Sequence, residues 1–182
     1  MEENELVNLC KQGDNRARKM LYEQFGGRLY AICMRYTQNR ETAQDLLHDG
    51  FITIFSSFDK FTWRGEGSLR AWMERVMVNN VLQHLRKHKT DREMLDVDEV
   101  YDLAADPTPE EVDQVPFKVL QKFIQELPDG YRTVFNLFIF EKKTHREIAK
   151  LLGINEKSSA SQLYRAKCSL AERITDWIKN KR

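Results

Sequence analysis

The chain has 182 residues, 41% of them hydrophobic, which is enough for one or two domains with small cores. Helix-forming residues dominate over 8 glycines and 4 prolines, so we expect an all-α protein. No apolar run approaches membrane-spanning length and the charged N-terminus lacks a signal-peptide core, which predicts a cytoplasmic protein without direct membrane insertion.

Charge is distributed unevenly along the chain although the net charge is only +1. Residues 1–90 carry 14 basic and 11 acidic side chains, residues 91–115 carry 1 and 10, and residues 116–182 carry 14 and 7, which gives +3, −9 and +7. This pattern predicts two helical domains, 1–90 and 116–182, joined by a flexible acidic linker at 91–115. Basic domains of this kind suit nucleic acid.

No residue pattern indicates catalysis. The sequence has no nucleophile paired with a base, no phosphate-binding loop and no metal-binding cluster, so we expect neither an enzyme nor a cofactor. Cys10, Cys33 and Cys168 are odd in number and far apart, which indicates reduced thiols and not a disulfide framework or a zinc site.

The first 58 residues have a helical apolar period. Asp14 is placed to cap a helix, and Gly26-Gly27 are expected to bend or interrupt it. Another helix begins at Asn39 and carries Asp45 and Asp49 on one face, since they are four residues apart. The two carboxylates fit either a solvated surface or a surface that binds a basic partner.

Residues 58–72 contain a loop in which aromatic and basic side chains alternate. Phe61 and Trp63 lie in a stretch broken by glycines, with Lys60, Arg64 and Arg70 around them. Aromatic rings that stack on bases, beside cations that hold phosphates, are typical of single-strand binding. The alternative is that both rings fold back onto the core.

A long helix is predicted from Ser68, as its cap, to about Lys89. Its inner stripe is Leu69, Met73, Met77, Val81 and Leu85. His84 and His88 have metal-ligand spacing, but no third ligand is apparent, so we place them on the solvent or DNA side.

Towards the C-terminus, Thr108, Pro109 and Glu111 predict a helix start. Residues 129–141 form a very apolar helix that we expect to be nearly enclosed. Residues 144–167 have the pattern of a helix-turn-helix, whose second helix usually enters a DNA major groove. Its signals are a Thr144/Glu147 capping box, Gly153 at the turn, Asn155 as the next cap, and an apolar seam at Leu163, Ala166, Leu170 and Ile174. A helical hairpin without a DNA role would look similar.

Taken in order, these motifs resemble a bacterial RNA polymerase sigma factor of the extracytoplasmic-function group, in the sigma-70 family. In AQDLLHDGF, Asp45, Leu46 and Phe51 match the polymerase-binding helix, with Asp49 where Glu is usual. In GSLRAWMERVMVNNVLQHLRK, the DNA-melting helix is matched by Trp72, Asn79, Leu85 and Arg86. The stretch LPDGYRTVFNLFIFEKKTHREIAKLLGI matches the family's pattern LP-x-x-x-R-x-V-F-x-L followed by EIA-x-x-L-G-I.

The sequence departs from the family pattern at several positions. The family often has Thr-Val-Lys-Ser-Arg-Leu where this chain has Ser-Ser-Ala-Ser-Gln-Leu at 158–163, so two cations and one apolar anchor are absent. Gln162 can instead pair with adenine, and the serines can reach phosphates or base edges. Gly50 stands where Val is usual, and Val78 and Gln83 stand where Arg and Asp are usual.

The resemblance implies that the protein binds core RNA polymerase, at the β′ coiled coil and the β flap, together with promoter DNA and an anti-sigma factor. The implied polymerase contacts are Asp45, Leu46, Asp49 and Phe51. Those to the single-stranded minus-ten element are Lys60, Phe61, Trp63, Arg64, Ser68, Arg70, Arg75, Asn79, Asn80 and Arg86. Those to the minus-thirty-five duplex are Thr144, Arg146, Lys157, Ser158, Ser159, Ser161, Gln162, Arg165 and Lys167.

Two other classes of function compete with this interpretation. A stand-alone helix-turn-helix regulator of duplex DNA accounts for residues 117–174 but gives residues 1–90 no role. An interaction adaptor accounts for the exposed acids but not for the basic recognition helix. Binding to core polymerase in the absence of DNA distinguishes a sigma factor from a regulator.

Overall fold

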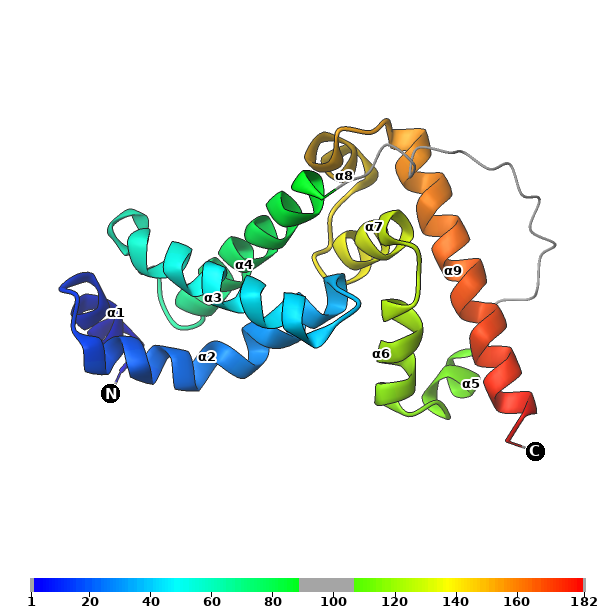
Figure 1. The fold of residues 1–182 in the computed structure, drawn as a ribbon, viewed down its shortest axis with the longest axis horizontal. Coiled ribbons are helices and arrows are strands. Elements are labelled where there is room, and N and C mark those ends of the chain that lie inside the picture. Colours follow the sequence, from blue (N-terminus) through cyan, green and yellow to red (C-terminus); the bar gives the residue numbers. More distant parts are fainter. Residues whose placement is uncertain (1, 89–106, 182) are drawn as a thin grey trace. The chain divides into compact units, whose positions relative to one another are not determined.

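The computed structural model describes residues 2–88 and 107–181, and every regular element in these two ranges is a helix (Figure 1). The predicted all-α fold is confirmed. The chain divides into two compact units, Met1–Lys89 and Thr90–Arg182. Most of the predicted acidic linker, residues 91–106, lies outside the described residues.

The N-terminal unit contains four α-helices and one 3-10 turn. They are α1 (Glu3–Lys11), α2 (Asn15–Tyr36), α3 (Arg40–Ser56), η1 (Phe58–Lys60) and α4 (Ser68–Lys87). The α2, α3 and α4 helices pack against one another around buried side chains such as Leu21, Leu46 and Met73. Two predicted caps are confirmed, since Asp14 accepts a hydrogen bond from the Ala17 amide at 2.8 Å and Asn39 from the Thr42 amide at 2.7 Å.

Of the bend or interruption predicted at Gly26-Gly27, the interruption is wrong, because α2 runs continuously for 22 residues. Two glycines inside a helix cost about 1 kcal/mol each relative to alanine. Leu29, Ile32 and Tyr36 beyond them are buried, and full burial of such a side chain stabilises the fold by about 1.5–3 kcal/mol. Packing therefore outweighs the local helix propensity.

Gly50 of α3 lies against the Met77 side chain of α4. A Cβ atom at this position would clash with the thioether of Met77. The absence of a side chain at Gly50, where the family usually has valine, allows the buried Met77 side chain to occupy this space.

Within its described residues, the C-terminal unit contains α5 (Pro109–Asp113), α6 (Phe117–Gln125), α7 (Asp129–Ile139), α8 (His145–Leu152) and α9 (Glu156–Lys179). The long α9 helix contacts each of the other four (Figure 1). The predicted capping boxes at Thr108/Glu111 and Thr144/Glu147 are both confirmed.

The α7 helix is not enclosed as its apolar sequence predicted. Phe135 and Phe138 are half-buried and Phe140 is exposed, whereas Arg132 is fully buried. The Arg132 guanidinium donates to the backbone carbonyls of Gln125 at 2.8 Å and Leu127 at 2.7 Å. This arginine faces inward because it satisfies carbonyl groups left without helical partners where α6 ends.

Candidate polymerase and nucleic-acid interfaces

The two aromatic rings of the loop between η1 and α4 differ in exposure. Phe61 is only 5% exposed, and its ring packs 4.9 Å from that of Trp72. Trp63 is 37% exposed. Phe61 therefore supports the loop from the core, and its DNA contact stays a prediction, whereas Trp63 is exposed and available to stack on a base.

Glycine geometry and one serine give this loop its shape. Gly65 and Gly67 have φ of 112° and 80°, in a region that favours glycine. The Ser68 hydroxyl accepts from the Arg64 amide at 3.1 Å and donates to the Gly65 carbonyl at 2.7 Å. Ser68 is the first residue of α4 and not its cap, and its hydroxyl serves the turn.

Exposed cations surround the loop and continue along α4. Lys60, Arg64 and Arg70 are exposed around Trp63. Arg75, Asn79 and Arg86 are also exposed, and their spacing of four and seven residues places them on one face of α4. Asn80 is half-buried and donates to the Leu46 carbonyl at 3.3 Å. This hydrogen bond joins α4 to α3, and the DNA contact of Asn80 stays a prediction.

The exposed face of α3 carries Asp45 and Asp49 as predicted. Leu46 and Phe51 are buried, and Phe51 packs on Tyr22 with ring centroids 4.6 Å apart, so both support α3 from the core while their polymerase contact stays a prediction. Ile52, seven residues after Asp45, is 66% exposed and was missed. The same helical period that paired the two aspartates places Ile52 beside them.

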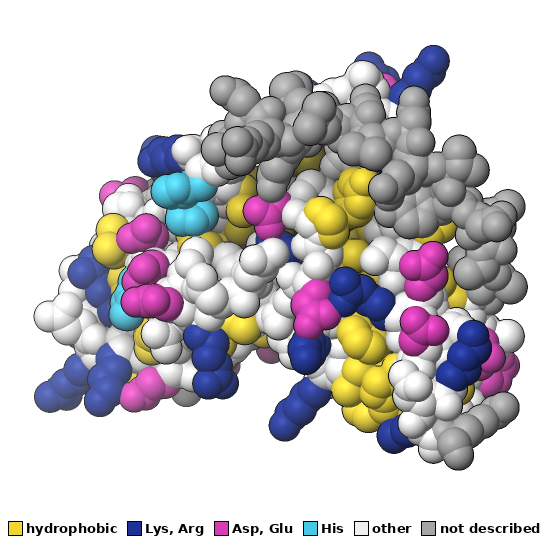
Figure 2. Space-filling view, turned by 45° about the vertical axis from the view of Figure 1, so that its right-hand side comes forward, with side chains coloured by type: hydrophobic (Ala, Val, Ile, Leu, Met, Phe, Trp, Pro, Cys, Tyr) yellow, Lys and Arg dark blue, Asp and Glu magenta, His cyan; other side chains and the backbone are white. Residues whose placement is uncertain are grey.

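Histidine side chains of α4 lie close to this acidic face. Burial and His88 lower the pKa of His84, and the carboxylates of Asp49 and Asp45 partly oppose that effect. Figure 2 shows acidic side chains gathered beside histidines on the face in view. Within the described ranges, no three His, Cys, Asp or Glu side chains are grouped to hold a metal ion.

The helix-turn-helix has the predicted turn. Gly153 closes α8 with φ 67°, and Asn155 accepts from the Ser158 amide at 2.7 Å. At the start of α8, the Thr144 hydroxyl donates to Glu147 at 3.0 Å and accepts from its amide at 3.3 Å. The Thr144 amide also donates to the Glu147 carboxylate, at 2.8 Å, and this bond together with the one from the hydroxyl lowers the pKa of Glu147. The Thr144 hydroxyl therefore serves the cap, and its DNA contact stays a prediction.

Three of the predicted contacts on α9 face the protein itself. Ser159 is fully buried, with its hydroxyl 2.9 Å from Nδ1 of His145. Gln162 lies against the start of α7, because a Cβ atom on Gly130 would come within 2.8 Å of its Oε1 atom. Arg165 donates to the Tyr131 hydroxyl at 3.3 Å. In this conformation Ser159 and Gln162 are turned towards the protein and Arg165 is held towards α7, and the base contacts of all three stay predictions.

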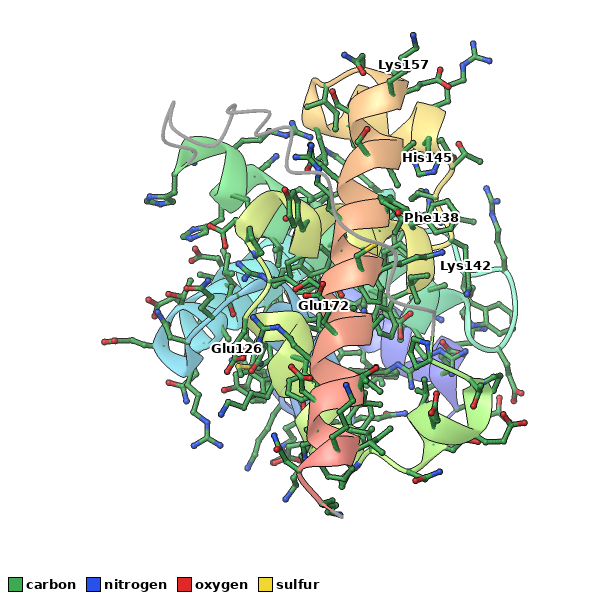
Figure 3. The ribbon with its side chains drawn as sticks, turned by 90° about the vertical axis from the view of Figure 1, so that its right-hand side faces the viewer. Glu126, Phe138, Lys142, His145, Lys157 and Glu172 are labelled. Carbon is green, nitrogen blue, oxygen red and sulfur yellow. The ribbon has the colours of Figure 1, made fainter. Side chains whose placement is uncertain are left out.

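Other α9 side chains do face outward. Lys157, Ser161 and Lys167 are exposed, Ser158 is half-buried, and Arg146 of α8 is exposed. Figure 3 shows Lys157 at the tip of the hairpin. His145 of α8 and Phe138 of α7 lie beside α9, farther from that tip. Tyr164 is 46% exposed and was missed. Extending the apolar seam back four residues from Leu163 would have assigned Ser159 to the core.

Two family models match the chain, one for each unit. Sigma-70 region 2 matches residues 21–90, and Sigma-70, region 4 matches residues 117–170. None of the described helices has the length and apolar character needed to cross a membrane.

Relatives match over most of the chain. It is 25% identical over 148 residues to the ECF RNA polymerase sigma factor SigM of Bacillus subtilis, covering 81% of this chain and 88% of that protein. It is 26% identical over 181 residues to SigW of the same organism, covering 93% and 95%.

Among solved structures, the sigma factor RpoE from Bartonella quintana, in complex with the anti-sigma factor NepR, shares the fold. The TM-score is 0.51 at 20% identity, covering 86% of this chain and 96% of that chain. The region 2 match covers most of the N-terminal unit, and the region 4 match lies within the C-terminal unit. This is the order that the sequence motifs predicted. The chain belongs to the sigma-70 family and is a sigma factor of its extracytoplasmic-function group.

Proposed function

We propose that this sigma factor binds core RNA polymerase, recognises a specific set of promoters and melts their DNA for transcription initiation. The observation that carries the proposal is the exposed Trp63, which lies among Lys60, Arg64 and Arg70 on a loop shaped by two glycines. An exposed ring among cations matches the chemistry of an unpaired base and its phosphates. Arg75, Asn79 and Arg86 would continue this contact along the non-template strand of the minus-ten element.

The α3 face is the proposed polymerase site. Asp45 and Asp49 carry like charges four residues apart, which a basic partner would neutralise. Ile52 adds an exposed apolar side chain to the same face. We propose the β′ coiled coil as its partner and the β flap as the partner of the C-terminal unit.

The exposed end of the helix-turn-helix is the proposed duplex-binding site. Lys157, Lys167 and Arg146 supply cations for phosphates, and Ser158, Ser161 and Tyr164 supply hydroxyl groups. They would contact the minus-thirty-five element in its major groove. Arg165 can join these phosphate contacts only if its hydrogen bond to the Tyr131 hydroxyl breaks.

Regulation by an anti-sigma protein is also proposed, and RpoE solved with NepR supports it. Because core polymerase and promoter DNA are found in the cytoplasm, we propose that location for this protein.

Run-off transcription with core polymerase on random promoter fragments tests the proposal and supplies a promoter. Trp63→Ala should weaken the open complex in permanganate footprinting by about 1–3 kcal/mol, with little change in duplex binding by gel shift. Trp63→Phe, which keeps a ring, is the matched control. Equal loss in both assays, or failure to join core polymerase without DNA, would refute the proposal.

A further inference from the structure

A carboxylate from the first helix reaches the start of α4. Glu3 accepts a hydrogen bond from the Gly67 amide at 2.9 Å through Oε2, and one from the Leu69 amide at 3.1 Å through Oε1. These contacts join positions more than 60 residues apart in the sequence. They link α1 directly to the end of the loop that carries Trp63.

The start of α4 has no side-chain cap of its own. Gly67, in the capping position, has a left-handed conformation and no side chain to offer. The adjacent Ser68 hydroxyl is engaged with Arg64 and Gly65. The first amides of a helix need acceptors, and a carboxylate also interacts favourably with the positive end of the helix dipole. Glu3 meets both needs.

The α1 helix is itself firmly held. Leu6, Val7 and Cys10 are buried against the unit. The same helix contacts η1, which leads into the loop, so α1 lies against both ends of the loop.

The loop borders an open space on the side of α1. A cleft of about 290 Å³ opens beside it, with Glu3, Glu66 and Arg70 in its lining. The two hydrogen bonds of Glu3, to the Gly67 and Leu69 amides, hold the C-terminal end of the loop beside this cleft. The α1 helix also precedes residues 21–90, where the region 2 match lies.

We infer that Glu3 is a positioning residue for promoter melting, because it fixes the loop conformation in which Trp63 and Arg64 meet the single strand. This inference rests on the proposed function of the loop. Glu3 touches no DNA in this scheme and acts through the Gly67 and Leu69 amides.

The test compares full-length Glu3→Ala, Glu3→Gln and Glu5→Ala, each assembled with core polymerase. Glu5 is exposed on the same first turn of α1, so its replacement removes an equal charge. Binding is measured to a fork with a single-stranded minus-ten element and to the intact duplex, both from a promoter selected by run-off transcription.

Loss of the cap should weaken fork binding by Glu3→Ala about three- to tenfold. Affinity for core polymerase should not change. Glu3→Gln, which keeps one acceptor oxygen, should lose less, and Glu5→Ala should match the wild type. Hydrogen exchange at the Gly67 and Leu69 amides should accelerate in Glu3→Ala.

Fork binding by Glu3→Ala equal to that of wild type would overturn the inference, as would unchanged exchange at both amides. If Glu3 has only a structural role, Glu3→Ala should lower thermal stability but leave the fork affinity of the folded holoenzyme unchanged. That result would also overturn the inference. If the wild-type holoenzyme itself fails to prefer the fork, the proposed function fails, and the Glu3 inference fails with it.

Discussion

Nδ1 of His145 lies 2.9 Å from the hydroxyl oxygen of Ser159, and this contact joins the two helices of the helix-turn-helix. The other side of the imidazole stacks on Phe138, with ring centroids 4.9 Å apart. Ser159 occupies the position where the family usually has valine. A polar contact therefore links α8 and α9 where an apolar anchor was expected.

Ser159→Ala should destabilise the C-terminal unit by about 1 kcal/mol, because it leaves a partly buried ring nitrogen without this partner. Native-state hydrogen exchange of α8 and α9 amides reports this unit separately. Ser161→Ala, an exposed neighbour, should change stability by less than about 0.5 kcal/mol. In a double-mutant cycle with His145→Ala, a coupling energy near zero would show that the contact contributes nothing.

Gly50→Val should destabilise the N-terminal unit by about 1–3 kcal/mol, because the added side chain must displace the buried Met77 thioether. Met77→Ala alone should also destabilise it, by about 2–5 kcal/mol, since it leaves a cavity. The double variant should lose less than the two single losses together. Strict additivity in denaturant unfolding would mean that the two side chains do not compete for one space.

Asp45→Asn combined with Asp49→Asn should have opposite effects on stability and on binding. Removing like charges four residues apart should stabilise α3 by a few tenths of a kcal/mol. Affinity for core polymerase should fall, and its dependence on salt should weaken. Asp59→Asn, in η1, is the control. Unchanged polymerase affinity, measured by fluorescence titration, would remove this face from the proposed interface.

The capping box of α8 should depend on pH. Hydrogen bonds from Thr144 lower the pKa of Glu147 from its ordinary value of 4.5. A carboxylate of this kind stabilises the fold fully above its unfolded-state pKa, and the effect is lost as the pH falls through the folded-state pKa. Glu147→Gln should therefore flatten the stability profile below about pH 4.5. Parallel profiles for both proteins would contradict this.

Local hydrogen bonding made much of the fold predictable. The caps at Asp14, Asn39, Thr144 and Asn155 were all confirmed, because each bond spans three residues. Predictions failed where distant parts of the chain decide. Packing of the buried residues beyond Gly26-Gly27 keeps α2 helical across the two glycines. Glu3, and not the predicted Ser68, caps α4.

The candidate sites were harder to predict, because the type of a residue does not determine whether its side chain lies on the buried or the exposed face of its helix. Leu46 and Phe51 belong to the motif but lie in the core, whereas the neighbouring Ile52 is exposed. Gln162 has suitable chemistry for adenine, yet its amide lies against α7, and no local pattern records that neighbour.

The length of α9 has a mechanical consequence. Its 24 residues span about 36 Å at 1.5 Å per residue. Lys157 lies near its first turn, while the Arg173–Glu126 ion pair ties its second half to α6. The helix also contacts α5, which lies at the C-terminal end of the predicted acidic linker. A force applied at α5 would therefore act on a single rigid helix whose other end carries the side chains that we propose for duplex binding.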